Sequence, residues 1–162
     1  MQFLFLSLFS LGIAAADQIS KYFTVKHIPL HGEVAFLPGV LSLTYVRNTG
    51  AAWSMLSGMQ WLFVAIFAAL TFALVWEYFK KPLPFTKGER WLIAAIYGGG
   101  LGNVIDRVRL GYVVDMFETK FMEFPVFNVA DIFITCGCIL LLVHLIFFNK
   151  AFWKDDNHDT LG

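Results

Sequence analysis

The stretch "FNVADIFITCGCILLLVHLIFF", residues 127–148, contains one acidic residue, Asp131, and no lysine or arginine. A helix that crosses a bilayer needs about 20 mainly apolar residues. This stretch meets that requirement, as do residues 3–23 and 59–79, and residues 91–107 form a shorter apolar run. A chain in lipid must satisfy its backbone polar groups internally, and these runs lack the alternation of barrel strands. We therefore predict an all-α membrane protein with four transmembrane helices.

The composition supports this class of protein. Of the 162 residues 58% are hydrophobic, and the mean hydropathy is +0.66, which is too apolar for an ordinary soluble domain. The length fits a single domain over residues 1–162. Basic and acidic residues both number 12, and no basic stripe with spaced aromatic residues occurs, so we expect no nucleic-acid partner. No lysine or arginine precedes the first apolar run, so we expect a retained helix and not a cleaved signal peptide.

The distribution of basic residues predicts the orientation in the membrane. Four spans place both termini on the same side as the loop "KKPLPFTKGER", residues 80–90. Lysines and arginines are divided evenly between the two sides, but the dense cluster in this loop favours the cytoplasm. Segments 24–58 and 108–126 then face the outside of the cell.

The first outer segment has a strand pattern. In "VLSLTYV", residues 40–46, apolar and polar residues alternate, which predicts a strand with one apolar face. We expect a small extracytoplasmic β platform between the first two helices. "AAWSML", residues 51–56, predicts a short interfacial helix, with Trp53 and Trp61 as anchors at the headgroup level. We expect residues 150–162 to form a flexible tail.

Polar residues recur at one depth on three of the predicted spans. Asp17 and Lys21 share a helix face, and the residues alone leave open whether they anchor the helix end or serve the function. Asp106 and Arg107 fit a structural bridge to neighbouring loops. Asn128 fits a helix cap. The members of the glycine group fit close helix packing; they are Gly98, Gly99, Gly100 and Gly102. The pair Cys136 and Cys138 fits small apolar helix residues.

Asp115 and Asp131 lie in apolar surroundings, and neither has a basic residue beside it in the sequence. An ionisable residue at membrane depth is costly and is therefore a functional candidate. The 15-residue connection can bring the two together, and two carboxylates in contact cannot both ionise comfortably. One would then take a proton from water while the other donates a proton to a carbonyl oxygen, so an aspartic hydrolase is a plausible interpretation.

Five blocks of the sequence carry a resemblance to a known family. They are "DQISK" at 17–21, "RNTGAAW" at 47–53, "GGGLGNVIDR" at 98–107, "VVDM" at 113–116 and "FNVAD" at 127–131. In this order, and on four spans, the chain resembles the lipoprotein signal peptidase (signal peptidase II) family over nearly its whole length. Met116 departs from the family, which commonly has phenylalanine there, so we expect altered packing beside Asp115.

The resemblance implies an aspartic endopeptidase of the bacterial inner membrane, with its active site at the extracytoplasmic face. Its substrates would be prolipoproteins, cut before a cysteine that already carries diacylglycerol, and the cyclic peptide antibiotic globomycin would inhibit it. Asp115 and Asp131 match the family's catalytic pair. The matching supporting positions are Asp17, Lys21, Asn48, Gly50, Asn103, Arg107, Asn128 and Ala130. The resemblance implies no metal and no organic cofactor.

Two other classes of function remain open at this point. A small transporter or channel subunit would use Asp17, Asp115 and Asp131 as a proton path, although the carboxylates gather at one depth and do not form a chain across the membrane. A structural assembly factor would explain the glycines and the platform, but it would leave Asp115 and Asp131 without a purpose.

Overall fold

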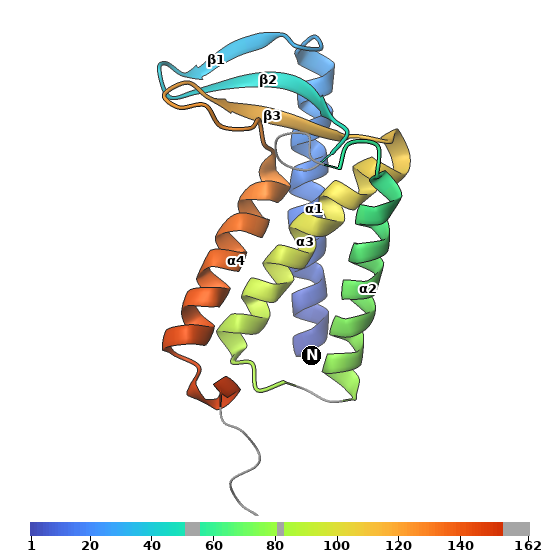
Figure 1. Cartoon of the computed structure of the whole chain (residues 1–162), viewed down its shortest axis with the longest axis vertical. Coiled ribbons are helices and arrows are strands. Elements are labelled where there is room, and N and C mark those ends of the chain that lie inside the picture. The colour runs from blue at the N-terminus through green and yellow to red at the C-terminus, as the bar shows by residue number, and fades with distance from the viewer. Residues whose placement is uncertain (51–55, 81–82, 154–162) are drawn as a thin grey trace, which may run out of the picture.

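The structure is a computed structural model that describes residues 1–50, 56–80 and 83–153. Four helices run side by side, and a small sheet lies across one end of them (Figure 1). The helices are α1 (Gln2–His27), α2 (Gln60–Phe79), α3 (Lys87–Leu110) and α4 (Val129–Phe147), and the strands are β1 (Glu33–Leu37), β2 (Leu41–Asn48) and β3 (Val113–Thr119). Three of the helices (α1, α2 and α4) are long and apolar enough to cross a membrane. The predicted mostly helical membrane fold is therefore confirmed.

Helix α3 is the centre of the bundle and packs against α1, α2 and α4. Its glycines make this possible, because a Cβ atom at each would collide with a neighbour. A Cβ at Gly98 would lie 2.6 Å from the carbonyl oxygen of Ser10 on α1, and one at Gly99 would lie 2.6 Å from that of Ala130 on α4. A Cβ at Gly100 would lie 2.7 Å from the Phe67 ring on α2. The predicted role of these glycines in close packing is confirmed.

Two of the helices that carry the polar residues, α3 and α4, begin with side-chain caps. Thr86 and Glu89 form a capping box at the start of α3, and Asn128 and Asp131 form one at the start of α4. A capping box satisfies backbone N–H groups that have no partner inside the helix. Asp131 is therefore held in the first turn of α4 by the backbone itself.

The sheet is antiparallel in the order β1-β2-β3. The strand predicted at 40–46 is confirmed as β2, but the platform does not lie only between the first two helices. Its third strand, β3, comes from the connection between α3 and α4, and it pairs Asp115 with Val46 of β2. Strand β3 carries no clear alternation because four consecutive residues, Val113–Met116, are buried.

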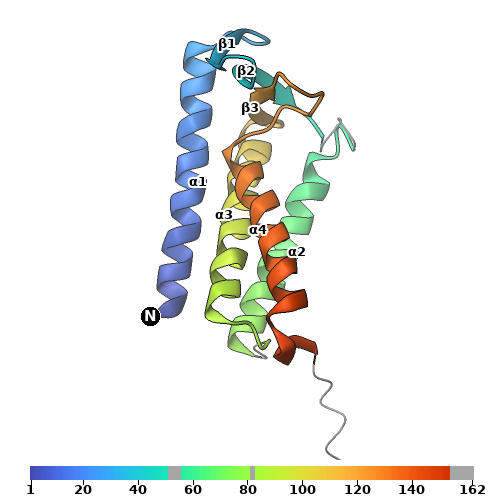
Figure 2. The same cartoon turned by 90° about the vertical axis from the view of Figure 1, so that its left-hand side faces the viewer.

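The ends of the bundle agree with the predicted arrangement. The sheet occupies one end, and the N-terminus, the α2–α3 connection and the 3-10 turn η2 (Lys150–Trp153) occupy the other (Figures 1 and 2). The predicted interfacial helix with Trp53 falls largely on residues 51–55, and most of the predicted tail is residues 154–162; both lie outside the described residues. Trp61, in the first turn of α2, is 72% exposed, as an anchor at the headgroup level requires.

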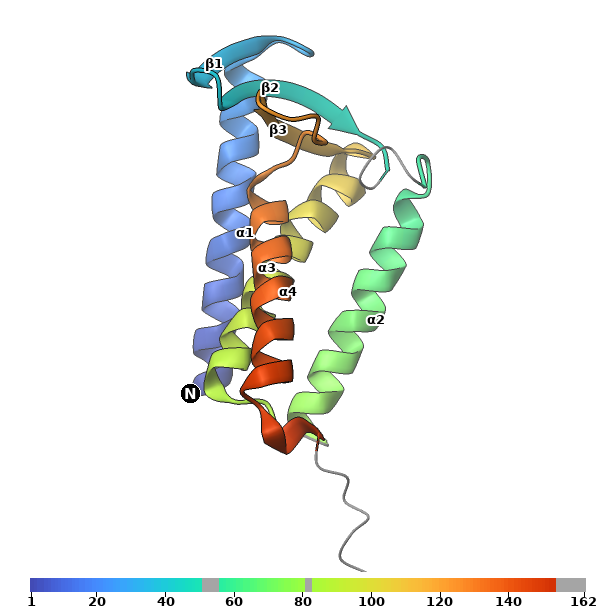
Figure 3. The ribbon, with the colours of Figure 1, turned by 60° about the vertical axis from the view of Figure 1, so that its left-hand side comes forward.

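Helix α2 is the least embedded of the four. None of its residues is buried, and it packs against α3 with an inclination to α1 and α4 (Figure 3). Helix α2 therefore lines cavities on two of its sides and is otherwise exposed to the surroundings of the bundle.

Candidate active site

Asp115 and Asp131 line one cavity of about 660 Å³ at the sheet end of the bundle. Asp115 projects from β3 and is 1% exposed, and Asp131 lies in the first turn of α4. Burial, followed by the neighbouring charge of Asp131, raises the pKa of Asp115 from 3.8 to about 7. The fold thus brings the two predicted carboxylates together, and Asp115 retains a proton at a pH at which an ordinary aspartate has lost it.

Two asparagines connect the carboxylates. The Asn128 side-chain amide donates to Oδ1 of Asp115 at 2.6 Å, and its backbone N–H donates to Oδ2 of Asp131 at 3.1 Å. Asn103 donates to Oδ1 of Asp131 at 2.8 Å and accepts from the Asn128 amide at 3.0 Å. Each carboxylate therefore has a fixed orientation relative to the other. The interpretation of Asn128 as a cap is confirmed, and the structure gives it a second set of contacts.

The segment after β2 reaches the same site. The Asn48 amide donates to Oδ2 of Asp115 at 2.9 Å, while its side-chain oxygen accepts from the Gly50 backbone N–H at 2.9 Å. Arg107 of α3 donates to the Gly50 carbonyl oxygen at 3.1 Å and lies 4.4 Å from the centre of the Phe63 ring on α2. Asn48, Gly50 and Arg107 therefore join β2, α2 and α3 around Asp115.

Behind the cavity lies a buried ion network. Lys21 pairs with Asp17 at 2.8 Å and with Asp106 at 3.0 Å, and it donates to the Asn103 side-chain oxygen at 2.9 Å. The carboxylate of Asp17 accepts from the Ala130 backbone N–H at 3.0 Å, at the start of α4. The network joins α1, α3 and the first turn of α4, and Lys21 contacts Asn103, which lines the cavity.

Asp106 is more closely connected to the site than the sequence indicated. It was interpreted as a structural bridge, and it does bridge, since it accepts from the Val114 backbone N–H at 3.0 Å. That bond fixes β3 directly beside Asp115. The spacing of three residues places Asp106 on the same face of α3 as Asn103, and this is the one sign of its connection that the sequence offers. Its partner Lys21 lies on α1, so the sequence does not show the ion pair. Met116, also on β3, is buried and lies 3.5 Å from the Thr24 hydroxyl, on α1.

The walls of the active-site cavity are polar at one end and apolar at the other. At the sheet end they carry the polar side chains already described. Further into the bundle they are apolar and come from α2, α3 and α4, among them Ile66, Phe67, Leu70, Val104 and Ile134. This arrangement suits an extended or helical apolar chain with a polar bond placed at the carboxylates. Within the described ranges, no group of three or more histidine, cysteine, aspartate or glutamate residues has the geometry to hold a metal ion.

Comparisons with known proteins identify the family of this chain. A model of the family described as signal peptidase (SPase) II matches residues 9–147. A lipoprotein signal peptidase of Enterococcus faecalis is 44% identical over 89% of this chain and 89% of its own, and one of Streptococcus agalactiae is 40% identical over 98% and 97%. A bacterial membrane enzyme whose structure was determined by the in meso method superimposes with a TM-score of 0.79, at 34% identity over 86% of this chain and 85% of its own. The chain belongs to the signal peptidase II family, a family of bacterial membrane proteases.

Proposed function

We propose that this protein is an aspartic endopeptidase that removes the signal peptide from prolipoproteins before a diacylglyceryl-modified cysteine. The observation that carries the proposal is that Asp115 and Asp131 both accept hydrogen bonds from Asn128 and lie at the polar end of a largely apolar cavity. The family's relatives are lipoprotein signal peptidases by name. The apolar walls suit a signal helix and acyl chains that remain in the membrane while the scissile bond reaches water.

The chemistry follows from the raised pKa of Asp115. Near neutral pH the pair holds one proton, which burial favours on Asp115. In the proposed reaction the ionised carboxylate of Asp131 removes a proton from a water molecule, and the resulting hydroxide attacks the scissile carbonyl carbon. The Asp115 carboxyl donates its proton to the carbonyl oxygen. Collapse of the tetrahedral intermediate breaks the C–N bond, and the amine leaves with a proton from the pair.

In this proposal the other predicted residues hold Asp115 and Asp131, and the chain around them, in position. Asn48, Asn103 and Asn128 orient the carboxylates by their amide hydrogen bonds. Gly50 and Arg107 hold the segment after β2 against the cavity, where the substrate backbone would pass. Asp17, Lys21 and Ala130 fix the start of α4.

We place the protein in the bacterial inner membrane, with the sheet end outside the cell. The basic cluster of Lys80, Lys87 and Arg90 lies at the opposite end and would face the cytoplasm. Globomycin, a cyclic peptide, would compete with the substrate for the cavity between α2 and α4. The transporter or channel alternative is not favoured, because the family is one of proteases.

The test uses the purified full-length protein in detergent or lipid with a diacylglyceryl-modified precursor and the same precursor without lipid. We expect cleavage of the modified form only, in the presence of EDTA, with inhibition by globomycin. Proton flux in proteoliposomes without any cleavage of the modified precursor would overturn the proposal in favour of the transporter.

A further inference from the structure

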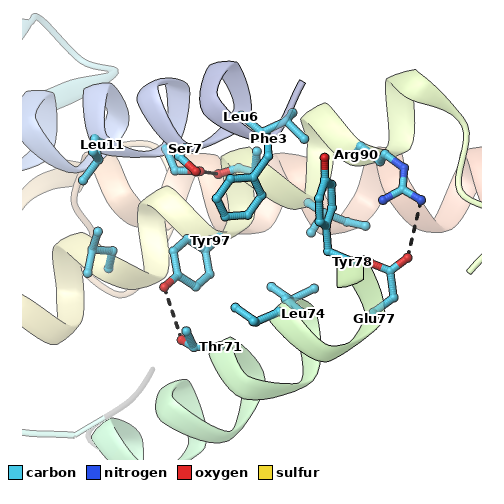
Figure 4. Close-up of a pocket in the computed structure, with 15 residues that line it drawn as sticks. Phe3, Leu6, Ser7, Leu11, Thr71, Leu74, Glu77, Tyr78, Arg90 and Tyr97 are labelled. Carbon is cyan, nitrogen blue, oxygen red and sulfur yellow. Dashed lines mark hydrogen bonds and ion pairs between the residues drawn. The ribbon is translucent and has the colours of Figure 1, made fainter. Parts of the chain in front are cut away.

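A second cavity lies on the other side of α2, in the half of the bundle that is far from the sheet. It has a volume of about 320 Å³ and opens between α1, α2 and α3 (Figure 4). Most of its lining is apolar and includes Phe3, Leu6, Leu11, Leu74, Ile93 and Leu101. Phe3 and Leu11 are 43% and 54% exposed, so this cavity is open at the side to the surrounding membrane.

The length of this cavity matches one leaflet of a bilayer. On α3 its lining extends from Arg90 to Leu101. At a rise of 1.5 Å per residue that interval is about 16 Å along the helix. Half of a hydrocarbon core of roughly 30 Å is about 15 Å. A lipid chain that enters from the N-terminal end of the bundle would therefore remain in contact with the lining for most of its length.

The polar groups of the cavity gather at the end where lipid headgroups would lie. Arg90 Nη2 lies 3.5 Å from Glu77 (Figure 4). It also donates to the Leu83 carbonyl oxygen at 3.3 Å. The Arg90 guanidinium lies 5.9 Å from the centre of the Tyr78 ring, and that ring lies 5.0 Å from the ring of Phe3. A guanidinium has five N–H donors, and the hydrogen bonds of the Arg90 guanidinium to described residues involve Nη2 alone. Donors therefore remain for an anionic group.

We propose that this cavity binds one acyl chain of a glycerophospholipid from the leaflet at the N-terminal end of the bundle, with the lipid phosphate at Arg90. Charge complementarity favours an anionic headgroup, because Arg90 balances the charge of Glu77 and the exposed residues Lys80 and Lys87 at the same end add net positive charge. The ligand class is thus an anionic phospholipid, and its site is separate from the one that holds Asp115 and Asp131.

The bound lipid would pack against the side of α2 that faces away from the active-site cavity. Helix α2 has no buried residue, yet it lines both cavities. The Phe67 ring faces the active-site cavity and stacks at 4.9 Å on Tyr97, which lines the lipid cavity. Thr71, one turn from Phe67, lies 3.3 Å from the Tyr97 hydroxyl (Figure 4). A chain packed against Tyr97 and Leu74 therefore limits the movement of α2 away from α3.

The first experiment counts retained lipids by native mass spectrometry after exchange into detergent with phosphatidylglycerol or phosphatidylcholine. The full-length wild type should retain one phosphatidylglycerol. Leu74→Trp fills the cavity and should lose it. Leu142→Trp is the matched control, because Leu142 is a lipid-facing residue on α4 that lines neither cavity and, like Leu74, lies five residues before the end of its helix. It should retain the lipid.

The second experiment tests the headgroup contact. Arg90→Gln should reduce the preference for phosphatidylglycerol over phosphatidylcholine by about tenfold, as the loss of one hydrogen bond to a charged group does. Lys87→Gln removes an exposed charge from the same helix end without touching the cavity, so it should change the preference less than Arg90→Gln does.

Equal lipid retention by Leu74→Trp and Leu142→Trp would overturn the proposal, as would displacement of the retained lipid by a signal peptide. If Leu74→Trp fails to fold, Leu11→Trp fills the cavity from the α1 wall and gives the same readout. Equal effects of Arg90→Gln and Lys87→Gln would contradict the assignment of the phosphate to Arg90.

Discussion

The side-chain amide nitrogen of Asn128 lies 2.6 Å from Oδ1 of Asp115. The same residue caps α4, where its side-chain oxygen accepts from the Asp131 backbone N–H at 3.0 Å. One side chain thus starts the helix that carries Asp131 and orients the carboxylate that β3 supplies. The two roles use different atoms of the amide, so a substitution can separate them.

We expect Asn128→Ser to separate those roles. Serine is as good an N-cap as asparagine, so the stability of the protein should change little. A hydroxyl is too short to replace the amide that reaches Asp115, so the activity should fall by about tenfold or more, as the loss of a hydrogen bond to a charged group of roughly 1.5–3 kcal/mol implies. Precursor cleavage and thermal unfolding of the same preparation measure both quantities. Full turnover in Asn128→Ser would mean that the residue is only a cap.

The raised pKa of Asp115 predicts a pH dependence of cleavage. Asp115 keeps its proton up to about pH 7 and loses it above that pH. The pair then lacks the acid that Asp115 supplied, so kcat/KM should fall by about tenfold per pH unit well above pH 7. A profile of kcat/KM measured from pH 6 to pH 9 with a modified precursor tests this. A flat profile over that range would show that the reaction does not use this proton.

The stability of the protein provides a check that does not depend on activity. Because the pKa of Asp115 is higher in the folded state than its value of 3.8 in the unfolded chain, its contribution to stability is present at low pH. That contribution is lost as the pH rises from about 4 to about 7. The unfolding free energy of the wild type relative to Asp115→Asn should therefore decline over this window and stay constant above it. A difference that rises with pH would contradict the direction of the shift.

Removal of Lys21 should destabilise the bundle. Its side chain is 3% exposed and pairs with two buried carboxylates, those of Asp17 and Asp106. Lys21→Met would leave both without their cation, and the loss of one member of a buried ion network costs about 3–5 kcal/mol. Lys120→Met is the matched control, because Lys120 is 30% exposed and pairs with Glu33 and Glu118 at the surface, where solvent screens the pairs and a much smaller loss is expected. Denaturation curves of the two variants in the same detergent should differ clearly; similar losses would mean that the buried network contributes little.

The fold could be predicted from the sequence where hydrophobic runs decide it. The helices begin and end within about four residues of the predicted spans, and α3 continues beyond its apolar part in both directions. The reason is that α3 is the central helix, and its ends are stabilised by the Thr86 cap and by Gly111, which has a positive φ of 78°. Strand β3 was missed because its buried run has no polar alternation, and its pairing with β2 is a contact between distant parts of the chain.

The sequence predicts the main residues of the site but not the hydrogen bonds and ion pairs that join them. Asp115 and Asp131 stand out because a carboxylate in apolar surroundings is costly. No spacing along the chain shows that Asn128 joins them, that Asp106 shares Lys21 with Asp17, or that Phe63 lies against Arg107. These contacts join residues of different helices, and they depend on the approach of the helices that the glycines of α3 permit.

The predicted orientation in the membrane can be measured with a single cysteine. Cys136 and Cys138 are both exposed and must first be replaced. A cysteine at the exposed residue Lys87, in the first turn of α3, should then resist a membrane-impermeant thiol reagent in intact cells, because we place that end in the cytoplasm. A cysteine at the exposed residue Phe121, after β3, is the control and should react readily. The opposite labelling pattern would invert the orientation.

The most direct test of the proposed reaction is cleavage of a diacylglyceryl-modified precursor by purified Asp115→Asn and Asp131→Asn variants with EDTA present. Asparagine is nearly the same size as aspartate, so each variant should fold and bind the precursor. Each should lose cleavage, and the double variant should be little worse than either one, because residues that act as a unit are not additive. Glu118→Gln, on the same strand as Asp115 but partly exposed, should cleave like the wild type. Substantial turnover by either single variant, or loss of wild-type cleavage on chelation, would contradict the assignment of the reaction to this pair of carboxylates.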